Sequence, residues 1–111
     1  MGRLLEFTDM KTGSVARFRA MVADRGTNLR TMRFSDLVEL KVSTDHVLVG
    51  PRTATISVIV EPQPNGSVRV VVQGFMKTLL RIGSHVALDG FYKHPDDKVA
   101  PMPDEEFRGY D

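Results

Sequence analysis

Two runs of alternating apolar and polar residues flank one turn near the middle of the chain. The runs cover residues 54–61 and 67–73, and in the first run Ile59 breaks the alternation. A period of two with β-branched side chains is typical of strands that bury one face. The predicted buried positions are Ile56, Val58, Val60, Val68, Val70 and Val72.

The sequence PQPNG between these runs predicts a tight reversal. Pro62 and Pro64 cannot donate to a strand ladder, so they end the first strand. Asn65 and Gly66 accept positive φ and turn the chain back. We therefore predict an antiparallel hairpin over residues 53–74.

The N-terminal third has no single period. Residues 3–8 predict a short first strand, and residues 9–13 a turn or loop. Residues 14–26 fit a strand with Phe18 and Val22 on one face, and they also fit a helix with Ser14 as N-cap and Gly26 just after its end. Three alanines and only two β-branched residues favour a short helix in this segment.

Shorter alternating segments predict the remaining strands. Residues 38–42 alternate and predict a strand, 43–45 a turn, and 46–49 a second short strand before the break at Gly50-Pro51. After the hairpin, residues 75–83 predict either one helical turn or a strand that continues past a glycine bulge. Residues 85–93 alternate again, 94–98 predict a turn, and 99–100 pair back onto the preceding strand.

Five or six short strands separated by turns indicate a sandwich or a small barrel. We predict a mainly β fold: one small antiparallel open barrel, OB-like or SH3-like, with a short N-terminal helix. This domain covers residues 1–98. Residues 99–111 contain two prolines and a cluster of acids, so we predict a loosely ordered acidic tail.

The composition excludes several classes of protein. The chain has 111 residues, 41% hydrophobic and 26% charged, which is ordinary for one soluble domain. It has no cysteine, so disulfides and thiolate chemistry are excluded, and a reducing cytoplasm suits it. Its uninterrupted apolar runs are too short to span a membrane.

The charges are unevenly distributed. Residues 96–111 hold six acids and two bases, which leaves 13 bases and eight acids in the rest of the chain. A basic body with an acidic end indicates either a polyanionic partner or a solvated surface with a solubilising tail.

Motifs for catalysis do not occur in this sequence. It lacks a phosphate-cradling glycine pattern, a GxSxG motif and an HExxH motif. His85 and Asp89 share one face of a predicted strand, and His94 follows nearby, but a surface histidine and a capped turn explain them without a metal. We predict no metal, no cofactor and no enzymatic activity.

Residues 70–93, VVVQGFMKTLLRIGSHVALDGFYK, resemble the later half of oligonucleotide-binding folds such as bacterial single-stranded DNA-binding and primosomal replication proteins. In that pattern Gly83-Ser84 turns into a strand and Gly90 permits a bend where a small barrel closes. Residues 93–98 would then form a ligand-contact loop between the last two strands.

The resemblance implies a surface that combines cations with aromatic rings, because single-stranded nucleic acid is bound by stacking and by phosphate contacts. The implied site residues are Arg69, Gln73, Phe75, Lys77, Arg81, Phe91 and Lys93. Arg69, Gln73 and Phe75 continue the outward face of their strand, and Lys77 and Arg81 are the phosphate contacts. Phe91 and Lys93 point outward from the next strand if Val86 and Leu88 point inward. Packing in the core is the alternative for both phenylalanines, and a solvated surface is the alternative for the arginines.

The main hypothesis is a non-enzymatic module that binds single-stranded nucleic acid. The alternative is a protein-interaction or regulatory adaptor domain, for example one encoded by a phage, or the subunit of a homo-oligomer that pairs through a sheet edge. A small-ligand or metal-dependent enzyme is the third hypothesis.

Overall fold

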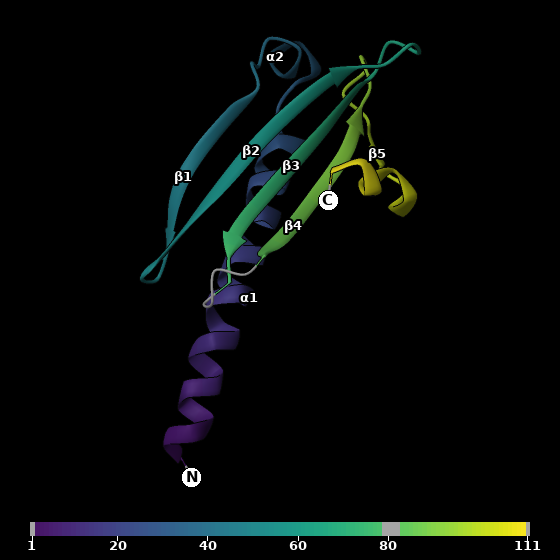
Figure 1. Cartoon of the computed structure of the whole chain (residues 1–111). Helices are drawn as coiled ribbons and strands as arrows, with labels where there is room; N and C mark the ends of the chain where they lie inside the picture. Colours follow the sequence, from purple (N-terminus) through teal and green to yellow (C-terminus); the bar gives the residue numbers. More distant parts are fainter. Residues whose placement is uncertain (1, 79–82, 111) are drawn as a thin grey trace.

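The computed structural model describes residues 2–78 and 83–110, with side chains from residue 13 onward. Five strands form one antiparallel sheet in the order β1-β2-β3-β4-β5, and helix α1 crosses behind it (Figure 1). The elements are α1 (Gly2–Arg30), α2 (Phe34–Leu37), β1 (Ser43–Val49), β2 (Arg52–Pro62), β3 (Val68–Lys77), β4 (Ser84–Lys93), β5 (Val99–Pro101) and a 3-10 helix, η1 (Asp104–Tyr110). The fold is therefore mainly β, with an open sheet and an N-terminal helix, as predicted.

The central hairpin is confirmed. Val58 of β2 lies opposite Val72 of β3, and Val60 lies opposite Val70. Five of the six predicted inward side chains are buried, and Val60 is half-buried against the same core. The Ser67 amide donates to the Asn65 side chain at 3.0 Å, which closes the predicted turn.

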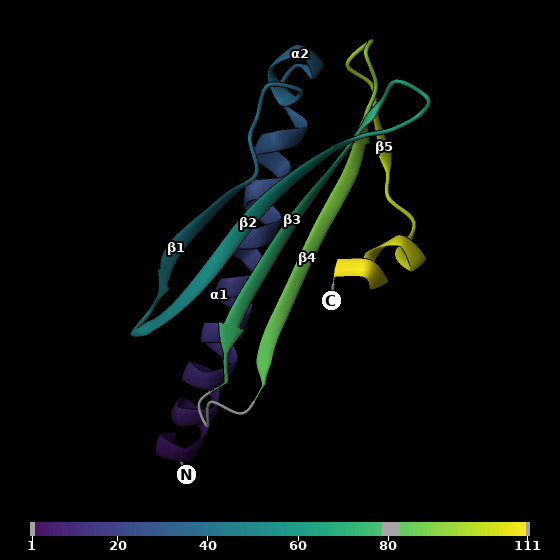
Figure 2. The same cartoon turned by 45° about the horizontal axis from the view of Figure 1, so that its top comes forward.

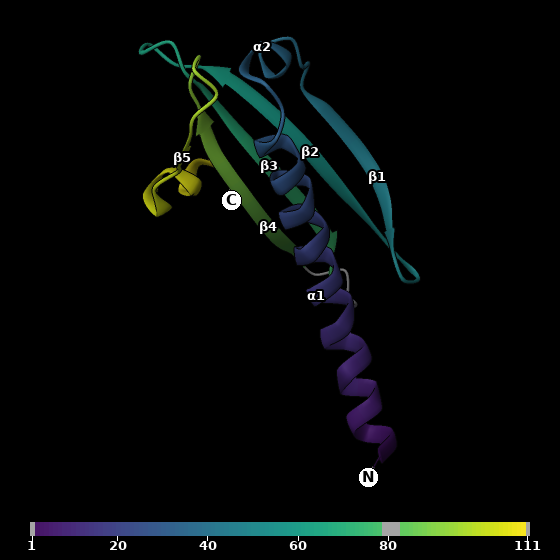
Figure 3. The same cartoon turned by 180° about the vertical axis from the view of Figure 1, so that it is seen from behind.

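Helix α1 is much longer than predicted. The helix expected over residues 14–26 is confirmed, but its predicted ends at Ser14 and Gly26 are wrong, because α1 continues past both. The predicted strand at 3–8 and turn at 9–13 are also wrong, because both segments belong to α1. Once the packed part of a helix exists, adding a residue costs far less than starting a new element, and no proline interrupts residues 2–12. The first part of α1 extends beyond the sheet (Figure 3). None of the described helices combines the length and the apolar character needed to cross a membrane.

The segment after α1 also differs from the prediction. Residues 38–42 form no strand, and the predicted turn at 43–45 is the start of β1. Leu37 is fully buried at the end of α2 and Leu40 packs partly on the core, whereas Val42 is 65% exposed. A spacing of three residues between the buried positions, rather than two, explains why the short alternation misled the prediction.

The second half of the sheet follows the sequence pattern closely. Strand β3 continues through Gly74 to Lys77, and a constant register with β4 shows that no bulge interrupts it. Of the predicted segment 75–83, residues 79–82 lie outside the described residues. The strand at 85–93, the turn at 94–98 and the return pairing at 99–100 are all confirmed.

Residues 99–110 pack against the sheet, in contrast to the loosely ordered tail that we expected. Met102 is 6% exposed, and η1 lies beside β4 on the side of the sheet away from α1 (Figure 2). A side chain at Gly90 would meet Met102 and Phe107, so the small size of Gly90 makes room for these two residues. The apolar side chains among the acids explain the packing, and composition alone did not reveal it.

Candidate functional site

The register divides the side chains of the sheet between two faces. Residues directly opposite one another in antiparallel strands point to the same side. Gly74 and Ala87 are opposite each other, and a side chain at Gly74 would collide with Val22 and Phe18 of α1. The residues on the same side of the sheet as Gly74 and Ala87 therefore face the helix. We call the other side the outer face. It carries Thr44, His46, Leu48, Thr53, Thr55, Ser57, Ile59, Glu61, Arg69, Val71, Gln73, Phe75, Lys77, Ser84, Val86, Leu88, Gly90 and Tyr92.

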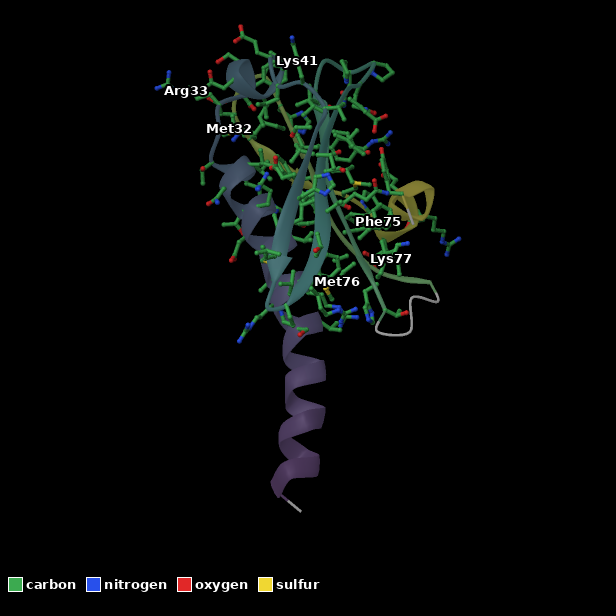
Figure 4. All side chains as sticks on the ribbon, turned by 60° about the vertical axis from the view of Figure 1, so that its left-hand side comes forward. Met32, Arg33, Lys41, Phe75, Met76 and Lys77 are labelled. Carbon is green, nitrogen blue, oxygen red and sulfur yellow. The ribbon has the colours of Figure 1, made fainter. Side chains whose placement is uncertain are left out.

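Four of the predicted site residues share the outer face of β3. They are Arg69, Gln73, Phe75 and Lys77, all of the same parity. Phe75 and Lys77 project from β3, while Met76 between them turns into the core (Figure 4). Arg81 lies outside the described residues.

Phe91 and Lys93 do not belong to this face, and their predicted outward orientation is wrong. They lie opposite Val70 and Val68, on the helix side, and are 0% and 4% exposed. We expected Val86 and Leu88 to point inward, but Ala87 and Asp89 do so instead. The small Ala87 allows α1 to approach closely, and Asp89 has a charged partner on the helix.

That partner is Arg30, the last residue of α1. Its guanidinium donates to both Asp89 carboxylate oxygens at 2.6 and 2.9 Å and lies 4.8 Å from the centre of the Phe91 ring. The hydrogen bond with Asp89 raises the pKa of Arg30, outweighing the opposing effect of burial. Lys93 donates to the Arg30 carbonyl at 2.8 Å and so caps the helix C-terminus.

The cluster of Arg30, Asp89 and Lys93 fastens α1 to β4. A side chain at Gly26 would come within 1.8 Å of Asp89, so the pair depends on glycine there. Sequence reasoning missed this cluster. The signal in the sequence was that Asp89 and Lys93 have the same strand parity as Phe91. If Phe91 is buried, these two charged side chains need partners inside the fold.

One end of the outer face is covered by η1. The Arg69 guanidinium nitrogens lie 3.3 Å from a Glu61 carboxylate oxygen and 3.5 Å from a Glu106 carboxylate oxygen. The guanidinium carbon lies 5.7 Å from the centre of the Tyr110 ring. Burial tends to lower the pKa of Arg69, but the negative groups around it raise it overall.

Three further hydrogen bonds hold η1 in place. Gln73 donates to the Tyr110 carbonyl, Tyr92 donates to Glu106, and the Tyr110 hydroxyl donates to Glu61. Burial and the bond to Glu61 raise the pKa of Tyr110 above its ordinary 10.0. Arg69 and Gln73, two of the predicted ligand residues, are therefore engaged by the chain itself.

The other end of the outer face is uncovered, and we call it the open patch. It consists of two neighbouring cross-strand rows, Leu48-Thr53-Lys77-Ser84 and His46-Thr55-Phe75-Val86. Leu48 is 73% exposed, and a hollow of about 300 Å³ lies over Phe75, Thr55 and Lys77.

Within residues 2–78 and 83–110, no three His, Asp or Glu side chains come together in a way that could hold a metal ion. The chain matches no protein-family model, curated protein sequence or solved structure. The resemblance of residues 70–93 to oligonucleotide-binding folds therefore stays a prediction.

Proposed function

We propose that the chain is a non-enzymatic binding module whose open patch binds another protein. The observation that carries this proposal is the composition of the patch. Its two rows combine three apolar side chains, three hydroxyls and His46, with Lys77 as the single permanent charge. A protein interface has this character, with an apolar centre and hydrogen-bonding groups around it.

The shape of the patch indicates the chemistry of the partner. The hollow beside Phe75 is large enough for one apolar side chain, which would act as an anchor. Lys77 at the rim favours an acidic residue next to that anchor. We therefore propose a partner surface that presents an exposed apolar side chain with a neighbouring carboxylate. The lack of cysteine suits action in the cytoplasm.

Site-specific photo-crosslinking tests this proposal. A benzoylphenylalanine at position 55 would capture a partner in cells, and the same group at position 28, on α1, is the control. The captured protein is then purified and titrated calorimetrically against the intact chain. We expect Phe75→Glu to weaken binding about tenfold or more, because it places a charge against the apolar anchor.

The matched control is Thr31→Glu, an exposed position directly after α1. It adds the same charge away from the outer face and should leave the affinity unchanged. Equal weakening by both variants, or by neither, would contradict a role for the open patch.

Single-stranded nucleic acid remains a second candidate, supported by one specific observation. The Arg69 guanidinium pairs with the Glu106 carboxylate and lies over the Tyr110 ring. The phosphate and the base of a nucleotide offer the same two partners, an anion and an aromatic ring. A nucleic acid would have to displace η1 to reach it. Fluorescence anisotropy with a labelled oligothymidylate should then show binding that weakens steeply with salt. No binding at low salt would contradict this candidate.

A further inference from the structure

The edge of β4 is open along most of its length. Strand β5 pairs only with Phe91, Tyr92 and Lys93, and no strand in the described part of the chain pairs with residues 84–90 on that side. A groove of about 390 Å³ runs between this edge and α1. Its walls are Arg19, Ala23 and Thr27 from the helix and residues 86–89 from the strand. An uncovered edge is a template for pairing with another chain.

The register shows which backbone groups point into the open edge. The His94 amide donates to the Lys98 carbonyl at 2.9 Å, in line with the β4–β5 register. In an antiparallel ladder both polar groups of a residue point to one side, and the side alternates along the strand. The backbone amides and carbonyls of the even-numbered residues of β4 therefore point away from β3.

Gly90 confirms this parity, because its two polar groups are bound by side chains. Its amide donates to Asp89 at 2.9 Å, and its carbonyl accepts from Arg30 at 3.2 Å. Val86 and Leu88 have the same parity, so their amides and carbonyls face the open edge. A strand placed there gains four backbone hydrogen bonds.

We propose that a second copy of this chain fills the edge, its own β4 running antiparallel to the first about a two-fold axis at Ala87. Val86 of each copy then lies opposite Leu88 of the other, and these are the residues whose backbone groups are open. The four backbone hydrogen bonds form between Val86 of each copy and Leu88 of the other, and the two sheets join into one. This pairing goes beyond the proposed binding of a partner protein and does not depend on it.

The side chains are self-complementary in the same register. On the outer face, Val86 meets Leu88, which pairs two apolar side chains across the strands. On the helix side, His85 lies opposite Asp89, and the small Ala87 lies opposite itself at the axis. No two like charges therefore lie opposite each other across the paired strands.

The helices also fit this symmetry. Residues 19, 23 and 27 are four apart and lie on one flank of α1. The axis brings Ala23 near Ala23 of the second copy, where two small side chains let the helices approach. Arg19, which takes part in none of the ion pairs in the described part of the chain, then approaches the end of the other groove that Asp89 lines.

Sedimentation equilibrium of the whole chain tests this pairing. At sub-millimolar concentration we expect twice the chain mass of 12.4 kDa. Val86→Pro removes an amide that faces the open edge and leaves the bonds between β3 and β4 in place. It should weaken the dimer about tenfold or more. Ala23→Arg should do the same without altering the strand, because it puts two like charges at the axis.

Two controls make the outcome decisive. Asn28→Arg adds the same charge on the other flank of α1, beside Arg25 and its partner Asp45 of β1, and should leave the dimer intact. Leu48→Pro alters the other edge of the sheet and should also leave it intact. A monomeric wild-type chain would overturn the proposal, and so would a dimer that survives both Val86→Pro and Ala23→Arg.

Hydrogen exchange of single amides gives a second readout if Val86→Pro fails to fold. In the dimer the amides of Val86 and Leu88 should be protected. Ala23→Arg should expose these two and leave Ala87 and Asp89, which face β3, as protected as before. Protection of all four amides in the Ala23→Arg monomer would contradict the assigned strand edge.

Discussion

The two faces of the sheet come from the same strands but meet different surroundings. The helix side buries Ile56, Val72 and Phe91 against Phe18 and Val22 of α1. The outer face has no second helix of comparable length in the described residues, and only η1 covers part of it. Core packing therefore accounts for the side chains on the first face and leaves those of the open patch unexplained.

The difference between the faces shows where the function is to be sought. On the helix side even the charged residues have structural tasks, since Arg30, Asp89 and Lys93 fix the end of α1. On the outer face Arg69 holds η1. In the described part of the chain, the side chains of the open patch take part in none of these ion pairs or hydrogen bonds, and this is why we assign binding to the patch.

The largest loss of stability should come from creating a cavity in the core between α1 and the sheet. Phe18 is fully buried, so Phe18→Ala should cost about 3–5 kcal/mol of unfolding free energy. Leu48 on the open patch is 73% exposed, and Leu48→Ala should change stability by no more than about 0.5 kcal/mol. Urea denaturation measures both, and similar losses would contradict the contrast between the faces.

Two glycines provide a sharper version of the same contrast. A Cβ at Gly74 would lie 2.6 Å from Val22, so Gly74→Ala should destabilise by about 1–3 kcal/mol. A Cβ at Gly13, in the interior of α1, meets nothing within 4 Å. Gly13→Ala should therefore stabilise by about 0.5–1 kcal/mol. Thermal unfolding followed by circular dichroism should show shifts of opposite sign.

The covered end of the outer face should contribute less than the core. Tyr110→Phe removes the hydroxyl that donates to Glu61 and leaves the ring over Arg69. We expect a loss of about 1 kcal/mol and faster amide exchange in η1. Arg108→Gln, at an exposed position of the same helix, is the control. An equal effect of the two substitutions would contradict the role of Tyr110 in holding η1 against the sheet.

The smallest effect should appear at alkaline pH. The folded pKa of Tyr110 is raised above the unfolded value of 10.0, so its contribution is complete below pH 10.0 and is lost as the pH rises through the folded pKa. As the pH rises across this range, the melting temperature of the wild type should fall to that of the Tyr110→Phe variant. A gap between the two proteins that stays constant would contradict the assignment.

Much of the sheet was predictable because its pattern is local. Val58 and Val72, or Val60 and Val70, alternate over many residues around a turn with clear chemistry, and the hairpin follows. The short alternation at 38–42 was not sufficient evidence, because Leu37 and Leu40 are instead packed at a spacing of three. The extent of α1 was also missed, since residues 3–8 carry no strong helical stripe.

The candidate site was less predictable than the fold. The parity of β3 placed Phe75 correctly on one face with Arg69 and Gln73. The parity of β4 was misassigned because Val86 and Leu88 look more apolar than Ala87 and Asp89. The partner of Asp89, Arg30, lies 59 residues away along the chain, so the local pattern of β4 could not show that Asp89 faces the helix.

Cysteine labelling tests the contrast between the faces most directly, because the natural chain contains no cysteine. Single substitutions at the neighbouring pairs Thr55/Ile56 and Met76/Lys77 place one thiol on each face in turn. We predict that cysteines at 55 and 77 react rapidly with a maleimide, and that those at 56 and 76 react only when the protein unfolds. Rapid labelling at 56 and 76, with protection at 55 and 77, would contradict the assignment of the core and of the open patch together.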